Sequence, residues 1–108
     1  MDPERARQRL SEERARVERE LEAIGRTQAA DEPEDTGDAA MELDQAERDE
    51  AIREELRRTL EAIERAQARL EEGTYGKSVV SGEPIPDGRL EAIPWADRKV
   101  EEEPGGRG

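Results

Sequence analysis

Cysteine and histidine are both absent from this sequence of 108 residues. Without cysteine the chain has no disulfide bond, no thiol nucleophile and no thiolate ligand for a metal ion. Without histidine it lacks the most common neutral metal ligand and the usual general base of enzymes. These two absences exclude most types of catalytic site, so we expect no catalytic residue and no enzymatic activity.

Large apolar residues are also scarce. The chain has one Tyr, one Trp and no Phe, and Leu, Ile and Val together make up less than a fifth of it. No apolar run approaches the roughly 20 residues that a membrane-spanning helix needs, and the first residues contain no apolar signal segment. We therefore expect no membrane partner and a cytoplasmic location.

The charged residues, by contrast, make up 44% of the chain, and the net charge is -12. An acidic protein lacks the positive charge that neutralises phosphates, so direct binding of nucleic acid is not expected. High charge with few apolar residues is typical of disorder. However, Ala, Glu, Lys, Leu and Arg make up more than half of the chain, which is typical of long helices when the apolar residues recur periodically.

The apolar residues do recur at the spacing of a coiled coil. Between residues 4 and 30 they are three to seven apart: Leu10, Val17, Leu21 and Ile24. Between residues 38 and 72 the spacing is similar: Ile52, Leu56, Leu60, Ile63 and Leu70. Pro33 and Gly37 interrupt the pattern in an acidic stretch. The sequence therefore predicts an all-α fold in which residues 1–72 form an antiparallel coiled-coil hairpin with a tip loop near 31–38.

Two registers of this hairpin fit the pattern. The one we prefer centres the turn on the Pro33 to Gly37 break and gives three pairs of facing residues: Leu10 with Ile63, Val17 with Leu56, and Leu21 with Ile52. The other register is shifted by one heptad and places Leu10 opposite Leu70.

Residues 73–103 have a different composition and are predicted to form a small module. Gly73 is placed to end the second helix with a left-handed cap. Both aromatic residues, Tyr75 and Trp95, lie in this segment, and we expect them to form its core with Ile85 and Leu90. The stretch SVVSGEPI is interpreted as a hairpin or a knuckle, and WADRKVEEE as a short C-terminal helix. Residues 104–108 are predicted to be a flexible tail.

The module carries a specific motif of aromatic, glycine and aliphatic positions: Tyr75, Gly76, Gly82, Ile85, Arg89, Leu90, Ala92, Pro94 and Ala96. With the preceding hairpin, this motif resembles the DksA/TraR family of bacterial transcription factors. Members of that family join an antiparallel coiled coil to a zinc finger with four cysteines. The resemblance implies a degenerate finger here, because the cysteine positions are occupied by Ser78, Ser81, Lys99 and Glu102.

These four residues do not fit a zinc ion. Zinc binds thiolate, imidazole or carboxylate groups, and only Glu102 supplies one of them. We therefore expect no zinc and no other cofactor. A hydrogen bond between Ser78 and Lys99 is one way to replace the metal, and the alternative is that these residues are solvated surface.

The tip loop carries a second point of resemblance. Family members that act on RNA polymerase have an Asp-x-x-Asp-x-Ala motif at the tip, and Asp35, Asp38 and Ala40 fit it. The alternative is helix capping, with Asp35 or Thr36 at the N-cap and Asp38 in the first turn. The two roles are compatible.

By this resemblance the protein is a non-enzymatic regulator that binds bacterial RNA polymerase through its secondary channel, with an acidic tip. The alternative function is a coiled-coil adaptor or structural protein that kept the fold without binding polymerase. The sequence leaves open whether a nucleotide alarmone acts as co-regulator, whether transcription is raised or lowered, and which oligomeric state the protein adopts.

Overall fold

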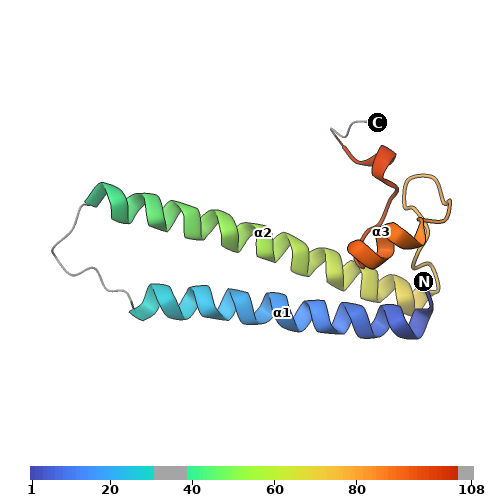
Figure 1. Ribbon diagram of the computed structural model, residues 1–108, viewed down its shortest axis with the longest axis horizontal. Helices are drawn as coiled ribbons and strands as arrows, with labels where there is room; N and C mark the ends of the chain where they lie inside the picture. Colours follow the sequence, from blue (N-terminus) through green and yellow to red (C-terminus); the bar gives the residue numbers. More distant parts are fainter. Residues whose placement is uncertain (31–38, 105–108) are drawn as a thin grey trace.

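The computed structural model describes the backbone of residues 1–30 and 39–104, and the side chains of residues 1–25 and 44–104. It contains α1 (Pro3–Ala30), α2 (Ala39–Glu72), α3 (Asp87–Ala92) and a 3-10 turn, η1 (Val100–Glu102). Helices α1 and α2 lie side by side as a hairpin, and the remainder packs at one end (Figure 1). Within the described residues there is no strand, only an isolated antiparallel bridge between Lys77 and Pro84. The predicted all-α hairpin is confirmed.

Local signals set the ends of the helices. The Asp2 carboxylate accepts a hydrogen bond from the backbone N–H of Arg5 at 3.0 Å and so caps α1, with Pro3 in the first helical position. At the end of α2, Gly73 has a φ of 82°. The N–H of Gly73 donates to the carbonyl of Leu70 at 3.3 Å, and that of Thr74 to the carbonyl of Arg69 at 2.9 Å. This is a Schellman motif, and it confirms the predicted left-handed cap.

The apolar seam is buried in the half of the hairpin next to the module, which we call the base. Leu10, Val17, Ile63 and Ala66 are fully buried there and form the hairpin core. The partly buried residues packed around them are Leu21, Leu56, Leu60, Leu70, Tyr75 and Trp95. The core therefore joins both helices to the two aromatic residues of the module.

The register differs from the one we preferred. Arg14 donates to Gln67 Oε1 at 2.8 Å and to Glu64 Oε2 at 2.9 Å. Pairing Leu10 with Ile63 would put Arg14 level with residue 59, roughly 8 to 12 Å along the axis from these two partners at ~1.5 Å per residue. The alternative, with Leu10 opposite Leu70, puts Arg14 between them. The contacts support this second register, and the preferred one is wrong.

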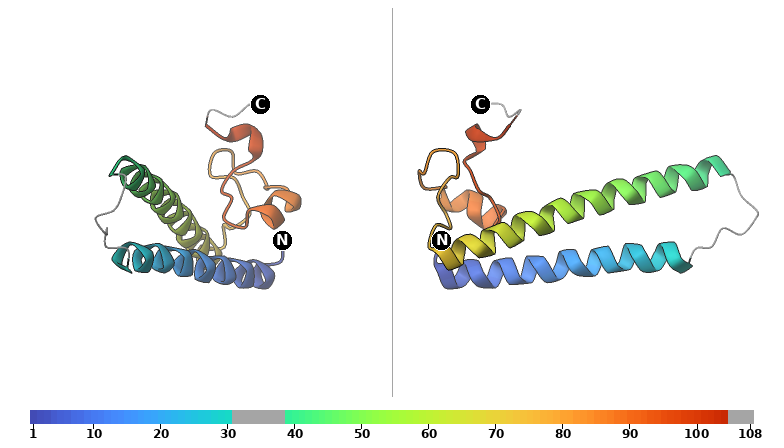
Figure 2. Two further views of the ribbon diagram at one scale, coloured as in Figure 1. Left: turned by 60° about the vertical axis from the view of Figure 1, so that its left-hand side comes forward. Right: turned by 180° about the vertical axis from the view of Figure 1, so that it is seen from behind.

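The error has a simple cause. The preferred register centred the turn between the helices, but α2 has 34 residues and α1 has 28. At the distal end, away from the module, α2 reaches beyond α1, and the two helices separate in all three views (Figures 1 and 2). Ile52, which the preferred register paired with Leu21, is 51% exposed.

The module has its own small core. Ile85, Leu90 and Ala96 are buried, and Met1, Tyr75 and Ile93 pack against them. A short C-terminal helix is present, but it is α3, directly after Pro86. The WADRKVEEE stretch, where this helix was predicted, forms only η1, so the predicted position is wrong. The backbone carbonyls of Asp97 and Arg98 are used elsewhere: they accept hydrogen bonds from Val79 N–H at 2.8 Å and from the Arg89 side chain at 3.1 Å. A continuous helix through these residues would lose both bonds.

Candidate functional site

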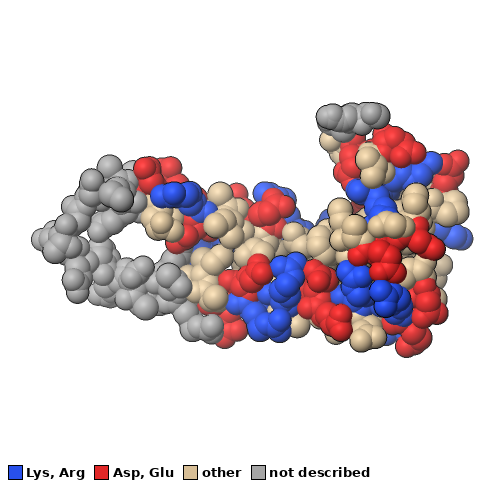
Figure 3. Space-filling model, in the orientation of Figure 1, with Lys and Arg blue, Asp and Glu red and all other residues tan. Residues whose placement is uncertain are grey.

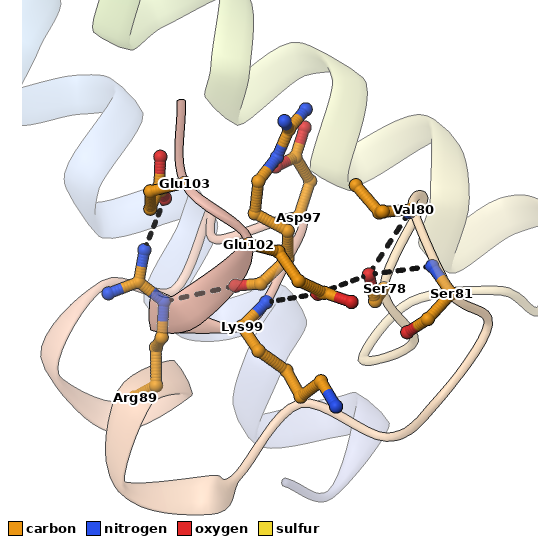
Figure 4. A network of polar contacts seen from close by, with 9 residues as sticks. Ser78, Val80, Ser81, Arg89, Asp97, Lys99, Glu102 and Glu103 are labelled. Carbon is orange, nitrogen blue, oxygen red and sulfur yellow. Dashed lines mark hydrogen bonds and ion pairs between the residues drawn. The ribbon is translucent and has the colours of Figure 1, made fainter. Parts of the chain in front are cut away.

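The four positions that correspond to zinc ligands lie in two turns that face each other (Figure 4). Ser78 and Ser81 belong to a tight turn closed by hydrogen bonds from Gly82 N–H to the Ser78 carbonyl and from Ser78 N–H to the Glu83 carbonyl, both 2.8 Å. Lys99 and Glu102 border η1, where Glu102 N–H donates to the Lys99 carbonyl at 2.9 Å. The fold thus brings together residues more than twenty positions apart, the separation of Ser78 and Glu102.

A hydrogen bond from Ser78 to Glu102 links the two turns directly, and bonds within each turn support it. The Ser78 hydroxyl donates to Glu102 Oε1 at 2.7 Å, and the backbone N–H of Lys99 donates to the same oxygen at 2.8 Å. Ser78 Oγ in turn accepts from the N–H groups of Val80 at 3.0 Å and Ser81 at 3.2 Å. We call this set of contacts between Ser78, Glu102 and the three N–H groups the polar knot (Figure 4). Ser78 is only 4% exposed, so its hydroxyl is satisfied by these protein groups instead of by water.

The expected hydrogen bond between Ser78 and Lys99 is not formed. The Lys99 ammonium instead pairs with Glu83 and lies 3.8 Å from Glu101. Lys99 takes part in the knot only through its backbone N–H, as the residue before η1, with Glu102 three positions later. Glu102 thus accepts from the backbone N–H three positions earlier, as the Glu of a capping box does. The Ser or Thr that begins the capping-box signature is replaced here by Lys99, so the sequence pattern did not point to Glu102.

The knot favours the charged form of its carboxylate. The hydrogen bonds from the Ser78 hydroxyl and then from the Lys99 N–H lower the pKa of Glu102 to about 2. At neutral pH the hydrogen bond from Ser78 to Glu102, which joins the two turns, is therefore charge-assisted.

The donor groups do not suit a metal ion. Of the four positions only Glu102 is a carboxylate, and its Oε1 already accepts two hydrogen bonds. Among the residues that the structure describes, no three His, Cys, Asp or Glu side chains converge in a way that could hold a metal ion. The arrangement can fasten the two turns to each other without one.

Aromatic residues join the module to the hairpin. The Tyr75 hydroxyl donates to the Pro94 carbonyl at 2.8 Å, and burial raises the pKa of that hydroxyl. Tyr75 packs against both cores, whereas Trp95, expected in the core of the module, packs against the hairpin core. Ile85 and Leu90 lie in the module core.

An ionic clamp adds to this junction. Glu91 of α3 accepts hydrogen bonds from Arg5 at 2.9 and 3.1 Å and from Arg9 at 3.3 Å, both on α1. These contacts, chiefly the hydrogen bond from Arg5, lower the pKa of Glu91. Nothing in the sequence pattern indicates pairs that lie more than eighty residues apart.

The tip motif is only partly visible. Asp35 and Asp38 lie outside the described residues, as do positions 105–108 of the predicted tail. Ala40 is in the first turn of α2, at the end of the hairpin farthest from the module (Figure 1). On the face shown in Figure 3, basic and acidic side chains alternate along the described parts of the helices, without a continuous basic surface. No helix among the described residues is both long and apolar enough to cross a membrane.

Known proteins share parts of this sequence. No family model matches the chain. A stretch of 65 residues, 60% of the chain, is 45% identical to the uncharacterised protein YteA of Bacillus subtilis (strain 168). A stretch of 53 residues, 49% of the chain, is 42% identical to general stress protein 16O of the same organism. The matches span only 27% and 32% of the lengths of these two proteins.

The fold has a much more complete match. The structure of transcription factor DksA2 from Pseudomonas aeruginosa aligns with a TM-score of 0.81 and 28% sequence identity, over 92% of this chain and 78% of DksA2. This similarity includes hairpin and module together, in agreement with the motif from Tyr75 to Ala96. The chain therefore has a DksA-like fold, and its motif supports the resemblance to the DksA/TraR family, without the cysteines of the zinc finger.

Proposed function

We propose that this protein regulates transcription by binding bacterial RNA polymerase, with the hairpin entering the secondary channel of the enzyme. The observation that carries the proposal is the match of hairpin and module, over 92% of the chain, to a transcription factor. A family of transcription factors also implies a role as a regulator and not as an enzyme.

The shape of the hairpin suits this role. At ~1.5 Å per residue, the 34 residues of α2 span about 50 Å, and the molecule measures 56 × 31 × 19 Å. A thin rod of this length can reach far into a channel that excludes globular domains. We propose that the module, residues 73–103, remains outside and holds the base of the hairpin in a defined orientation through Tyr75, Trp95 and the contacts of Glu91.

The tip provides the active groups in this proposal. Asp35 and Asp38 would lie near the catalytic magnesium ion, and Ala40 would permit close approach. Charges act strongly at short range in a partly dehydrated site that holds a metal ion and phosphates. The effect on transcription is then electrostatic, requires no direct contact between this protein and nucleic acid, and takes place in the cytoplasm.

The test separates binding from regulation. Purified protein is measured for binding to bacterial RNA polymerase and for its effect on transcription in vitro, beside the variant Asp38→Asn. We expect both proteins to bind with affinities within about twofold and only the parent to change transcript yield, because Asn keeps the shape and some capping capacity but removes the charge. An Asp38→Asn variant that regulates like the parent would reduce the tip to a helix cap. Absence of polymerase binding by the parent would favour the adaptor function.

A further inference from the structure

Gly25 has no evident structural reason to be glycine. It lies inside α1, and a Cβ atom built on it meets no atom within 4 Å. Its backbone is not in the left-handed region either, in contrast to Gly73, Gly76 and Gly82, which have positive φ. An alanine would fit without contact or strain. The remaining effect of this glycine is on the helix itself, because it lowers the local helix–coil equilibrium about fivefold relative to alanine.

The position of Gly25 makes that effect important. Among the described side chains of α1, which end at residue 25, Leu21 is the last that packs against the hairpin core, and Ile24 is only partly buried. Beyond this level the two helices separate (Figures 1 and 2), and Ile52 on α2 is half exposed. The stability of a helix end that makes no contact with the core depends on the helix propensity of its own residues. Gly25, a residue of low helix propensity, lies at the start of this end.

The opposite helix is built differently at this level. α2 contains no glycine along its whole length. Within its distal half, Gln45 donates to Asp49 at 3.1 Å, and Arg53 pairs with Glu50 at 2.7 Å. Such pairs at three and four residues support a helix locally. The distal hairpin thus has a reinforced arm, α2, and a weakened arm, α1.

From this asymmetry we propose that Gly25 is a built-in hinge, at which the end of α1 up to Ala30 opens independently of the hairpin core. α2 then keeps the reach of the hairpin constant while the end of α1 adapts to the surface against which it docks. The hinge is a property of the free protein. Its use during docking rests on the proposed function, in which that surface is the wall of the polymerase channel.

Amide hydrogen exchange tests the hinge in the full chain. We expect Gly25→Ala to slow exchange of the amides of residues 26–30 about fivefold and to leave those around Leu10 and Ile63 unchanged. The matched control adds Ala23→Gly, at an exposed position of the same helix, and should restore the fast exchange. If Gly25→Ala changes nothing at residues 26–30, or slows exchange equally throughout the hairpin, there is no hinge.

A second measurement adds RNA polymerase. If the end of α1 adapts on docking, exchange at residues 26–30 slows in the complex, and by a smaller factor in Gly25→Ala than in the parent. Equal factors in both proteins would show that docking does not use the hinge. Failure of the parent to bind polymerase would overturn the proposed function. Amide exchange of the free proteins would still show whether the hinge exists.

Discussion

A single residue, Glu102, connects the two turns of the module, as the metal ion does in a zinc finger. One of its oxygens accepts hydrogen bonds from Ser78 in the first turn and from Lys99 in the second. A zinc site holds such turns through four ligands and one ion. Here the connection requires one carboxylate, one buried hydroxyl and backbone N–H groups. It contains no thiol, so it cannot be lost by thiol oxidation.

The pH dependence of the module follows from the pKa of Glu102. Its folded value of about 2 lies below the ~4.3 of an unfolded glutamate, so its contribution to stability is complete above about pH 4.5 and is lost as the pH falls toward 2. We expect acid to loosen the module of the parent in this interval more than that of Glu102→Gln, which cannot titrate here. Trp95 fluorescence against pH measures this difference. Coincident profiles would mean that Glu102 does not stabilise the folded module.

Packing holds the elements in place more than ion pairs do. The pairs of Arg5 and Arg9 with Glu91 are partly exposed, and exposed pairs contribute about 0–1 kcal/mol each. Tyr75 and Trp95, by contrast, cover the buried end of the hairpin core. The position of the module on α1 and α2 therefore depends mainly on these two aromatic residues, and the ion pairs add orientation.

Removal of the Trp95 side chain tests this dependence. We expect Trp95→Ala to destabilise the docked module by roughly 2–3 kcal/mol, below the range for a fully buried Trp because Trp95 is only partly buried. Amide exchange of residues 75–100 should accelerate, while that of the distal half of α2 stays constant. Val79→Ala, at a position 54% exposed, is the matched control and should have little effect. Equal effects of the two substitutions would contradict a specific role of Trp95.

The whole molecule is a rod with two small cores at one end. Tyr75 contacts both the hairpin core and the module core, so these cores are joined where the chain passes from α2 into the module. The distal half of the hairpin has no comparable core among its described residues, and it extends from this base (Figure 1). Stability is thus concentrated at the base and the proposed functional groups at the opposite end.

Metal independence is a prediction about the whole protein. Because Ser78, Ser81 and Lys99 offer no thiolate, imidazole or carboxylate, we expect purified protein to contain no stoichiometric zinc. A strong chelator should leave the helical circular dichroism signal and the melting temperature unchanged. Elemental analysis and thermal melts provide the measurement. About one zinc ion per chain, or a lower melting temperature with chelator, would require a metal site outside the polar knot.

The helical hairpin and the chemical groups available to the module could be predicted from the amino-acid sequence. Heptad spacing from Leu10 to Leu70 and the cap at Gly73 depend on neighbours within a few residues, which a single chain displays directly. The absence of thiolate and imidazole ligands is a matter of composition alone. The motif from Tyr75 to Ala96 then carried the resemblance to a family.

Which distant groups meet depends on the three-dimensional arrangement of the chain. Both registers satisfied the same heptads, and the contacts of Arg14 with Glu64 and Gln67 distinguished them. The Ser78 hydroxyl bonds to Glu102, and the Lys99 ammonium, its expected partner, pairs with Glu83 instead. The WADRKVEEE stretch has helical propensity, yet its carbonyls bond to Val79 and Arg89 instead. Such choices depend on geometry between segments far apart in the chain, and local preferences are too weak to determine them.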